Sequence, residues 1–285
     1  MRVRLNKDEQ TNLDLIEVRS ALNNKYLTIS KFGAHVLDWF PILNAPSILW
    51  KSDVDYKSFD PIRGGIPICF PWFATREGYQ NHGYARVQDW NIKKITTTLT
   101  TVSVQLSTTV TDKTNRLDSY FLTLLITASS ESNMLHQELT ILNTSDHSVT
   151  CSGGFHTYYA ISDINTVTLT GLSGASYFNK VNGKYESNQL KISDLSCLDR
   201  VYRSNDMVQL IDSSYQYLRK ITINKIGLAD WVIWNPLATT KNFSDITMGS
   251  ELHFICIEPA QVDPVTLGAN QTLVWKQSIT VSDVS

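Results

Sequence analysis

Cysteine is scarce in this chain, and the four cysteines stand far apart. Cys69, Cys151, Cys197 and Cys256 form no C-x-x-C pair, the spacing typical of zinc sites and redox pairs. The six histidines show no zinc-ligand spacing either. We therefore expect no metal site. We interpret the cysteines as reduced, buried groups of a cytoplasmic protein, although the sequence leaves a disulfide open.

An excess of charge of either sign is also missing. The 25 basic and 27 acidic residues leave a formal net charge of −2, so no basic field attracts nucleic acid or an anionic membrane. The longest apolar stretch, around Tyr120 to Ala128, is too short to span a bilayer, and Met1 to Asn12 lacks the apolar core of an export signal. We expect a soluble protein without nucleic-acid or membrane partners, in which any anion site is local.

Apolar patterns of helical length are absent, and apolar residues recur mostly with period two. Segments rich in Val, Ile, Thr, Tyr and Phe alternate in this way, as half-buried strands do. The turn cluster from Asn143 to His147 predicts a hairpin between the strands on either side of it. The predicted fold class is all-β, with antiparallel sheets packed face to face or closed on themselves. Strands are predicted at Val102–Leu106, Tyr120–Ile126, Leu135–Leu142, Val149–Ile161, Asp230–Trp234, Leu252–Ile257 and Thr272–Ile279.

Internal repeats, low-complexity tracts and Pro/Gly/Ser linkers are missing as well. The polar stretch Asn182–Gln189 opens with an Asn-Gly turn signal, so we interpret it as an exposed connection within a domain. We predict one domain over residues 1–285.

Two unusual segments, Arg63–Phe73 and His82–Arg86, are separated by only eight residues. Each places an arginine within three positions of a glycine. Arginine carries a planar fork of donors that suits carboxylate or phosphate, and glycine lets the backbone approach a ligand closely. The pair indicates an anion site. The alternative is that the glycines and prolines only shape a loop and that both arginines are solvated.

Two strand segments carry single titratable residues. His156 follows Gly153 and Gly154 on a predicted strand, and Glu258 ends an apolar strand. Charged groups are rarely buried without a partner, and a carboxylate in such a place tends to have a perturbed pKa that suits a general base. The alternatives are a core histidine with satisfied hydrogen bonds and a glutamate in solvent.

These segments together resemble the hexose-6-phosphate mutarotase family, also called glucose-6-phosphate 1-epimerases, within the aldose 1-epimerase (galactose mutarotase-like) superfamily. The resemblance covers most of the chain in order, which argues against chance agreement. It implies a large antiparallel β-sandwich of the galactose mutarotase type, with the site in a concave cleft on one sheet. The matching segments are R-G-G-I-P-I-C-F-P-W-F at Arg63–Phe73, H-G-Y-A-R at His82–Arg86, F-H-T-Y-Y at Phe155–Tyr159, G-L-S-G-A-S-Y-F-N-K at Gly171–Lys180, D-R-V-Y at Asp199–Tyr202, W-V-I-W-N-P at Trp231–Pro236 and C-I-E-P-A at Cys256–Ala260.

The resemblance also implies a reaction, the interconversion of the α and β anomers of a hexose 6-phosphate. A base removes the proton from the anomeric O1 and an acid delivers one to the ring O5, so that the ring opens, rotates and recloses. By resemblance Glu258 is the base and His156 the acid, while His82 binds a sugar hydroxyl or assists at O5. Neither a metal nor an organic cofactor is needed.

Arg63 and Arg86 become a phosphate clamp by the same resemblance, because a sugar phosphate carries roughly −1.5 to −2 charges near neutral pH. Neutral-sugar relatives do not need such a clamp. Arg76, in the loop between the two motifs, is a candidate for a third cation there. We expect a small-molecule sugar phosphate as the partner and a monomeric protein.

Other positions are candidates for contacts with the sugar itself. Asp230 stands where the family often has an acid that contacts sugar hydroxyls. Trp72 and Trp234 are candidates for apolar faces against the sugar ring, and core positions explain them equally well. The chain departs from the family at Pro236–Lys241, which lacks an aromatic residue and an acid-lysine pair, and at Tyr84, which replaces phenylalanine. The first departure bears on the rim of the cleft and on substrate choice.

Three other functions are open. A glycoside hydrolase needs two carboxylates that flank the scissile bond, and only Glu258 lies in a motif. A non-catalytic sugar-phosphate-binding module would keep the arginines, yet the intact His156 and Glu258 argue against it. An aldose 1-epimerase that acts on neutral hexoses is the nearest alternative, and the pair of Arg63 and Arg86 is the feature that separates it from the phosphosugar enzyme.

Overall fold

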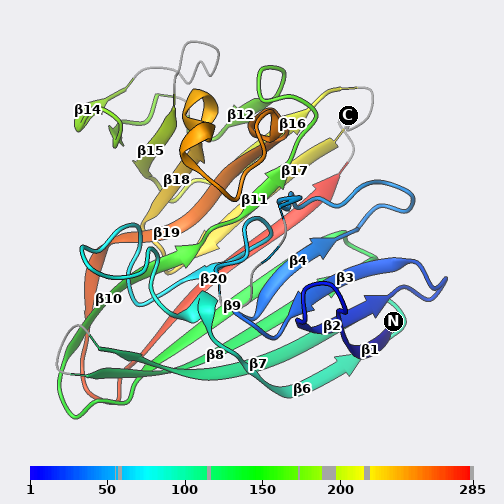
Figure 1. Cartoon of the computed structure of the whole chain (residues 1–285), viewed down its shortest axis with the longest axis horizontal. Helices are drawn as coiled ribbons and strands as arrows, with labels where there is room; N and C mark the ends of the chain where they lie inside the picture. Colours follow the sequence, from blue (N-terminus) through cyan, green and yellow to red (C-terminus); the bar gives the residue numbers. More distant parts are fainter. Residues whose placement is uncertain are drawn as a thin grey trace.

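Three antiparallel sheets make up the computed structural model of this chain (Figure 1). The structure describes residues 1–54, 56, 60–113, 117–172, 174–187, 197–214 and 219–282. Two of the sheets have eight strands each and the third has four. The predicted all-β class is confirmed, since the helices of the described residues are short 3-10 turns at Ala85–Val87, Leu237–Asn242 and Ser250–His253.

The first eight-stranded sheet has the order β12-β16-β17-β20-β9-β8-β7-β6. Alternate residues of its longest strands are buried, as the period-two pattern of β8 requires. Its strands are β6 (Asn91–Thr97), β7 (Thr101–Asp112), β8 (Asp118–Ser129), β9 (Met134–Asn143), β12 (Thr168–Thr170), β16 (Val208–Asp212), β17 (Arg219–Ile226) and β20 (Thr272–Ser282).

The second eight-stranded sheet has the order β14-β13-β15-β18-β19-β10-β5, and β11 also pairs with β19. Its central strands β18 and β19 are buried on both faces over most of their length. Its strands are β5 (Ile68–Cys69), β10 (Val149–Phe155), β11 (Tyr158–Ala160), β13 (Tyr177–Asn179), β14 (Lys184–Glu186), β15 (Leu198–Arg203), β18 (Asp230–Asn235) and β19 (Phe254–Leu267).

The two large sheets pack face to face as a sandwich. The Thr157 hydroxyl, beside β11, donates a hydrogen bond of 3.1 Å to Gln277 of β20, and the Phe70 ring lies with its centroid 6.0 Å from that of Trp275. One continuous apolar cluster contains buried residues from both sheets and from the small sheet. The sandwich that the resemblance implied is therefore present.

A four-stranded sheet at the N-terminus was not foreseen by the sequence analysis, which named no strand before residue 102. Its strands are β1 (Arg2–Lys7), β2 (Asp14–Arg19), β3 (Lys25–Ser30) and β4 (His35–Trp39), paired in that order. They are the blue strands of Figure 1. β1 is largely exposed, and β4 is buried throughout, so neither shows the alternation on which strand prediction relied.

The predicted hairpin at Asn143–His147 is wrong, although the turn itself is present. β9 pairs with β8 and β20, whereas β10 pairs with β19 and β5. Both edges of β9 are therefore already paired, so β10 cannot form a hairpin with it, and the chain crosses to the other sheet. The Asn143 side chain anchors the crossing, since its amide donates to the carbonyls of His147, Leu267 and Gly268 at 2.8 to 3.0 Å.

The predicted strands are present, with changed bounds. The segment Val149–Ile161 is two strands with a break at His156 and Thr157, and Leu252 and His253 belong to a 3-10 turn. The exposed Asn-Gly turn at Asn182 lies between β13 and β14, while Asn188 and Gln189 lie outside the described residues. All four cysteines are free, and Cys197 is half-buried, not buried as expected.

None of the helices among the described residues has the length and apolar character needed to cross a bilayer.

We predict that Asn143→Ala lowers the free energy of unfolding by about 2–4 kcal/mol, because three carbonyls lose their donor and the bond to that of Leu267 is buried. Urea denaturation measures this change. Asn91→Ala, at an exposed strand position, is the matched control and should stay within about 0.5 kcal/mol of the original protein. Equal effects at both positions would show that the crossing does not depend on Asn143.

Candidate active site

The alternation of β19 divides its side chains between two environments. Ile255 and Ile257 belong to the main apolar core between the large sheets. Cys256 and Glu258 point to the opposite face, since successive side chains of a strand do so. Glu258 is nevertheless only 1% exposed, because loops and neighbouring side chains cover this outer face.

Residues of β18 and β15 that pair with β19 or with each other extend the face on which Cys256 and Glu258 lie. Glu258 lies opposite Val232 of β18, and Cys256 lies opposite Trp234. Trp234 in turn lies opposite Asp199 of β15. Directly opposed residues share a face of the sheet, so these five side chains form one surface.

His156 reaches the same surface through the break between β10 and β11. Gly154 pairs with Ala260 on one side of the break, and Tyr158 pairs with Cys256 on the other. His156 lies midway between these two pairs and therefore at the level of Glu258. The sequence analysis placed His156 inside one continuous strand. The structure instead ends β10 at Phe155 and begins β11 at Tyr158, so His156 lies between the two strands.

The His156 and Glu258 side chains lie close together and are almost fully buried. Nδ1 of His156 is 3.4 Å from Oε1 of Glu258. Burial raises the pKa of the Glu258 carboxyl well above its usual range, and the nearby Asp199 adds to this. Burial also lowers the pKa of the His156 imidazole well below its usual range, and Arg63 and Arg86 lower it further. In the absence of a ligand, both shifts favour the neutral forms.

His82 lies beside this pair. Its ring centroid is 5.1 Å from that of His156 in an edge-on arrangement. Its Nδ1 accepts a hydrogen bond of 3.2 Å from the Ala74 backbone N–H and lies 3.2 Å from the Cys69 sulfur. Since Nδ1 accepts, the proton of the neutral ring is on Nε2. Burial lowers the pKa of His82 well below its usual range, with Arg86 adding to the effect.

Arg63 is anchored at the edge of the site. Its Nε donates to Asp245 at 2.9 Å, and its Nη1 donates to the Tyr158 hydroxyl at 2.8 Å. Tyr158 stacks on His156, with ring centroids 4.7 Å apart. Burial alone would lower the pKa of the Arg63 guanidinium, but Tyr158 and Asp245 outweigh burial and raise it. Gly65 holds the adjacent loop against the small sheet, because a Cβ there would meet the Val36 carbonyl.

The positive charge of Arg86 has fewer compensating partners than that of Arg63. Its side chain is buried, its Nη2 donates to the Asn81 carbonyl at 2.8 Å, and its Nε has no hydrogen-bond partner. Within the described part of the chain it forms no ion pair with a carboxylate. Burial lowers its pKa. A buried guanidinium without a counter-charge is costly and indicates a place for an anion.

Three candidate residues have hydrogen-bond or ion-pair partners outside the His156–Glu258 pair. Arg76 forms an ion pair of 3.1 Å with Asp112 and lies over the Trp72 ring, 5.0 Å from its centroid. The Trp72 indole donates to the Gln80 carbonyl at 3.0 Å. Asp230 is buried four residues before Trp234 on β18 and accepts hydrogen bonds from Arg203 and the Val262 backbone. Trp234, by contrast, meets His156 edge-on at 5.9 Å.

The structure adds residues that the sequence analysis gave no role. Tyr158 and Asp199 lie inside quoted motifs, which offered a signal, but only the fold shows that they face the site. Lys180 forms an ion pair of 3.2 Å with Asp199. Asp245 lies outside every quoted motif, so no sequence signal connected it with Arg63.

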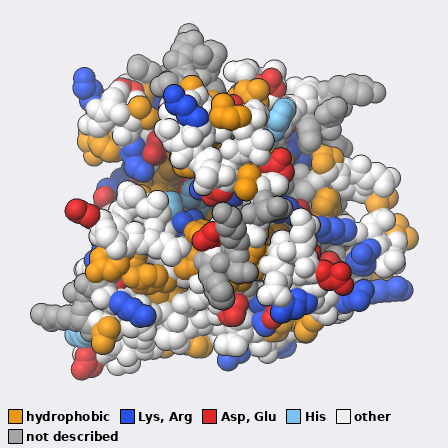
Figure 2. All heavy atoms as spheres, in the orientation of Figure 1, with side chains coloured by type: hydrophobic (Ala, Val, Ile, Leu, Met, Phe, Trp, Pro, Cys, Tyr) orange, Lys and Arg blue, Asp and Glu red, His pale blue; other side chains and the backbone are white. Residues whose placement is uncertain are grey.

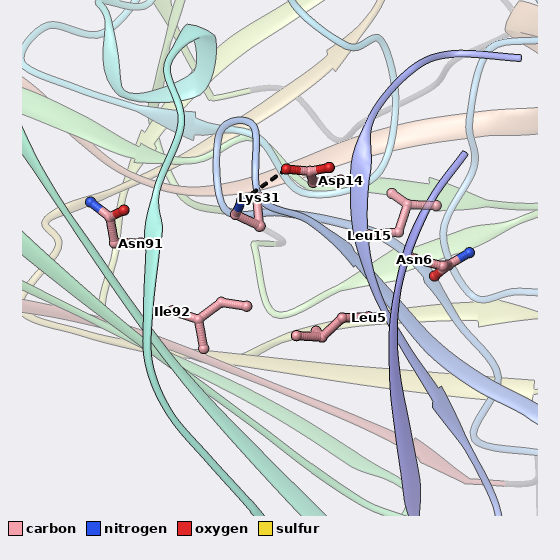
Figure 3. A pocket seen from close by; sticks show the side chains of 7 residues that line it. All are labelled: Leu5, Asn6, Asp14, Leu15, Lys31, Asn91 and Ile92. Atoms are coloured by element: carbon pink, nitrogen blue, oxygen red, sulfur yellow. Dashed lines mark hydrogen bonds and ion pairs between the residues drawn. The ribbon is translucent and has the colours of Figure 1, made fainter. Parts of the chain in front are cut away.

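Two of the hollows on the described surface bear on where the site lies. One, of about 1000 Å³, begins at Arg63, Phe243 and Asp245 and extends along the small sheet. Figure 2 shows the molecule hollowed near its centre, with histidine and basic side chains inside the recess. The other, of about 480 Å³, lies between Leu5 of β1 and Ile92 of β6, far from these groups (Figure 3). Its ion pair of Lys31 with Asp14 is satisfied, so this hollow offers no catalytic chemistry.

One group of metal-ligand type occurs among the residues that the structure describes. It consists of His156, Cys256 and Glu258, whose ligand atoms all lie within 4.8 Å of one another. The sequence analysis expected no metal site because it considered spacing along the chain alone, and His156 is remote from the other two residues.

Comparison with known proteins supplies a family. A family model described as "Aldose 1-epimerase" matches residues 14–280. A relative named "Putative glucose-6-phosphate 1-epimerase" from Cenchrus ciliaris is 26% identical over 96% of this chain and 86% of its own length. A relative of the same name from Escherichia coli is 28% identical over 80% of this chain and 77% of its own length.

Solved structures agree on the fold. The crystal structure of a "putative mutarotase" from Salmonella typhimurium superposes with a TM-score of 0.84 at 22% identity, over 99% of this chain and 97% of that one. A "galactose mutarotase-like protein" from Clostridium acetobutylicum superposes with a TM-score of 0.75 at 13% identity, over 100% and 99% of the two chains. The predicted galactose mutarotase-like architecture is confirmed.

We predict that inorganic phosphate raises the pKa of His156. A bound anion offsets the positive potential of Arg63 and Arg86, which now lowers this pKa, so the imidazolium persists to higher pH. NMR titration of the histidine rings with and without phosphate measures the shift. His136, whose Nδ1 meets Ser278 on the other large sheet at 2.8 Å, is the internal control and should not respond. An unchanged His156, or an equal shift at both rings, would contradict an anion site at these arginines.

Proposed function

The chain belongs to the aldose 1-epimerase family and is a mutarotase of that family, and we propose that its substrate is a hexose 6-phosphate, with glucose 6-phosphate as the first candidate. The observation that carries the proposal is the buried Arg86, whose Nε lacks a partner and which interacts electrostatically with Arg63. A neutral sugar would leave this charge uncompensated. Relatives at 26 to 28% identity are named for glucose 6-phosphate, which supports the same choice.

The proposed chemistry uses Glu258 as the base at O1 and His156 as the acid at O5. O1 and O5 are bonded to the same anomeric carbon, so the base and the acid must lie close together. The separation of 3.4 Å between the two side chains is compatible with this requirement. After ring opening, C1 rotates, and reclosure returns the proton to O1 through Glu258 while His156 recovers its own from O5.

The substrate's phosphate helps to set the protonation states in this proposal. The reaction needs an ionised Glu258 and a protonated His156, whereas burial favours the two neutral forms. A phosphate at Arg63 and Arg86 removes part of the repulsion that the imidazolium meets. Binding therefore moves the proton toward His156, where the reaction requires it.

The other residues of the site complete the proposal. His82 presents its Nε2–H toward a sugar hydroxyl or O5, and Trp234 offers an apolar face to the ring. Arg76 and Asp230 are left out, since their partners are Asp112 in the one case and Arg203 in the other. A non-catalytic binding module is disfavoured, because binding alone gives no reason to bury an acid-base pair.

We predict that Glu258→Gln and His156→Asn each slow anomer exchange by at least about 10²-fold, because each keeps the approximate shape and loses the proton transfer. Exchange spectroscopy by NMR, corrected for spontaneous mutarotation, measures the rate. Arg76→Gln, outside the proposed machinery, should retain the original rate. A folded Glu258 or His156 variant with full activity would remove that residue from the mechanism.

The substrate class is tested by kcat/KM for glucose 6-phosphate beside free glucose in the original protein, Arg63→Ala and Arg86→Ala. A charged hydrogen bond contributes about 1.5–3 kcal/mol, and about 1.4 kcal/mol is a factor of ten. We expect a loss of roughly 10- to 150-fold on glucose 6-phosphate and a much smaller loss on glucose. Arg86→Lys should recover part of the loss, since it keeps the charge without the planar fork.

Equal losses on both sugars would mean that the arginines serve the fold or the sugar ring. The neutral-hexose epimerase would then be the better assignment. Arg76→Ala provides the matched control for removing a guanidinium, because its ion pair with Asp112 lies outside the site.

A further inference from the structure

A thiol that the proposed mechanism does not use lies beside the proposed acid-base pair. Cys256 is fully buried and shares the face of β19 with Glu258. The ligand atoms of Cys256, Glu258 and His156 all lie within 4.8 Å of one another. A sulfur, an imidazole nitrogen and a carboxylate oxygen are the three kinds of atom that zinc sites in proteins use.

This convergence follows from the register of the sheet. Residues 256 and 258 are two apart on one strand, so their side chains point to the same face. His156 approaches from the break between β10 and β11, at the level of Glu258. The backbone of all three residues is held by paired strands or by ladder ends, which preorganises the group.

Two polar atoms of the group lack partners. Nδ1 of His156 and Oε2 of Glu258 are buried and make no hydrogen bond. Nδ1 and the other carboxylate oxygen, Oε1, are 3.4 Å apart without hydrogen-bond geometry. In a tetrahedral zinc site with nitrogen and oxygen ligands at about 2.1 Å, two ligand atoms are also about 3.4 Å apart.

We infer that His156, Cys256 and Glu258 form a zinc-binding site, in which the ion excludes the sugar and inhibits the enzyme. Water or hydroxide completes the tetrahedron at the side that faces the cleft. The thiolate selects a borderline or soft ion over magnesium or calcium, which prefer oxygen ligands. The ion engages the lone pairs of both the proposed base and the proposed acid, so proton transfer stops.

The charges of the site balance when the ion is bound. Thiolate and carboxylate together carry the two negative charges that neutralise the zinc ion. The Cys256 proton, and the proton of Glu258 where that group is protonated, leave to solvent on binding. Binding should therefore strengthen as pH rises and release about one to two protons per ion. Arg63 and Arg86 repel the ion, whereas the thiolate and the carboxylate attract it at shorter range.

Cobalt tests the site directly and independently of turnover. Chelator-treated protein is titrated with Co²⁺, and we expect one equivalent to produce a sulfur-to-cobalt charge-transfer band in the near ultraviolet, which Zn²⁺ then removes. Cys256→Ser should lose the band. Cys197→Ser is the matched control and should retain it, because Cys197 is the more exposed thiol and lies outside the group.

The inference that zinc inhibits the enzyme rests on the proposed function, and it is tested separately by the rate of anomer exchange. Saturating Zn²⁺ should lower anomer exchange by at least about 10²-fold, as loss of the acid-base pair would, and EDTA should restore it. Cys256→Ser should keep the basal rate and need at least about tenfold more Zn²⁺ for inhibition. Cys256→Ala serves the same purpose if the serine variant does not fold.

The outcomes separate the two proposals. A band that is absent, or that depends on Cys197, would overturn the metal site. Zn²⁺ that inhibits the original protein and Cys256→Ser equally would overturn it too. A band that depends on Cys256 in a protein without phosphosugar activity would support the metal site and contradict the substrate assignment.

Discussion

The register of β19 with its neighbours is the constraint on which the site depends. Pairing with β18 on one side sets Val232 beside Glu258, and pairing with β10 and β11 on the other side leaves a break that His156 occupies. A shift of one residue would turn Glu258 into the apolar core and Ile257 onto the outer face of the sheet, beside His156. The same hydrogen bonds that build the sandwich therefore align the proposed base with the proposed acid.

Burial of charge is the second theme of the structure. Arg86 is buried without a carboxylate partner among the described residues, while Glu258 and His156 are both driven toward their neutral forms. Such an arrangement costs stability in the empty protein. In the proposed function, a dianionic substrate relieves the repulsion between the arginines and the imidazolium, which couples substrate binding to protonation of the proposed acid.

Much of the site could be anticipated because its chemistry is local in sequence. The sequence alone shows an arginine close to a glycine in two segments, and a glutamate at the end of an apolar strand. The hairpin at Asn143–His147 could not be judged in this way, since a turn sequence does not reveal which strands have free edges. The partner of Arg76 could not be predicted either, because proximity along the chain does not decide the direction of a side chain, and the structure pairs Arg76 with Asp112.

The sequence by itself determined the all-β class, the family and the chemical identity of the candidate groups, because period-two patterning and short motifs are encoded residue by residue. The tertiary structure alone decided which groups meet. His156 and Glu258 are a hundred residues apart, and only strand pairing brings them to 3.4 Å. Asp245 and Cys256 acquired their neighbours in the same way, because contacts between distant segments depend on register and burial, which no single segment contains.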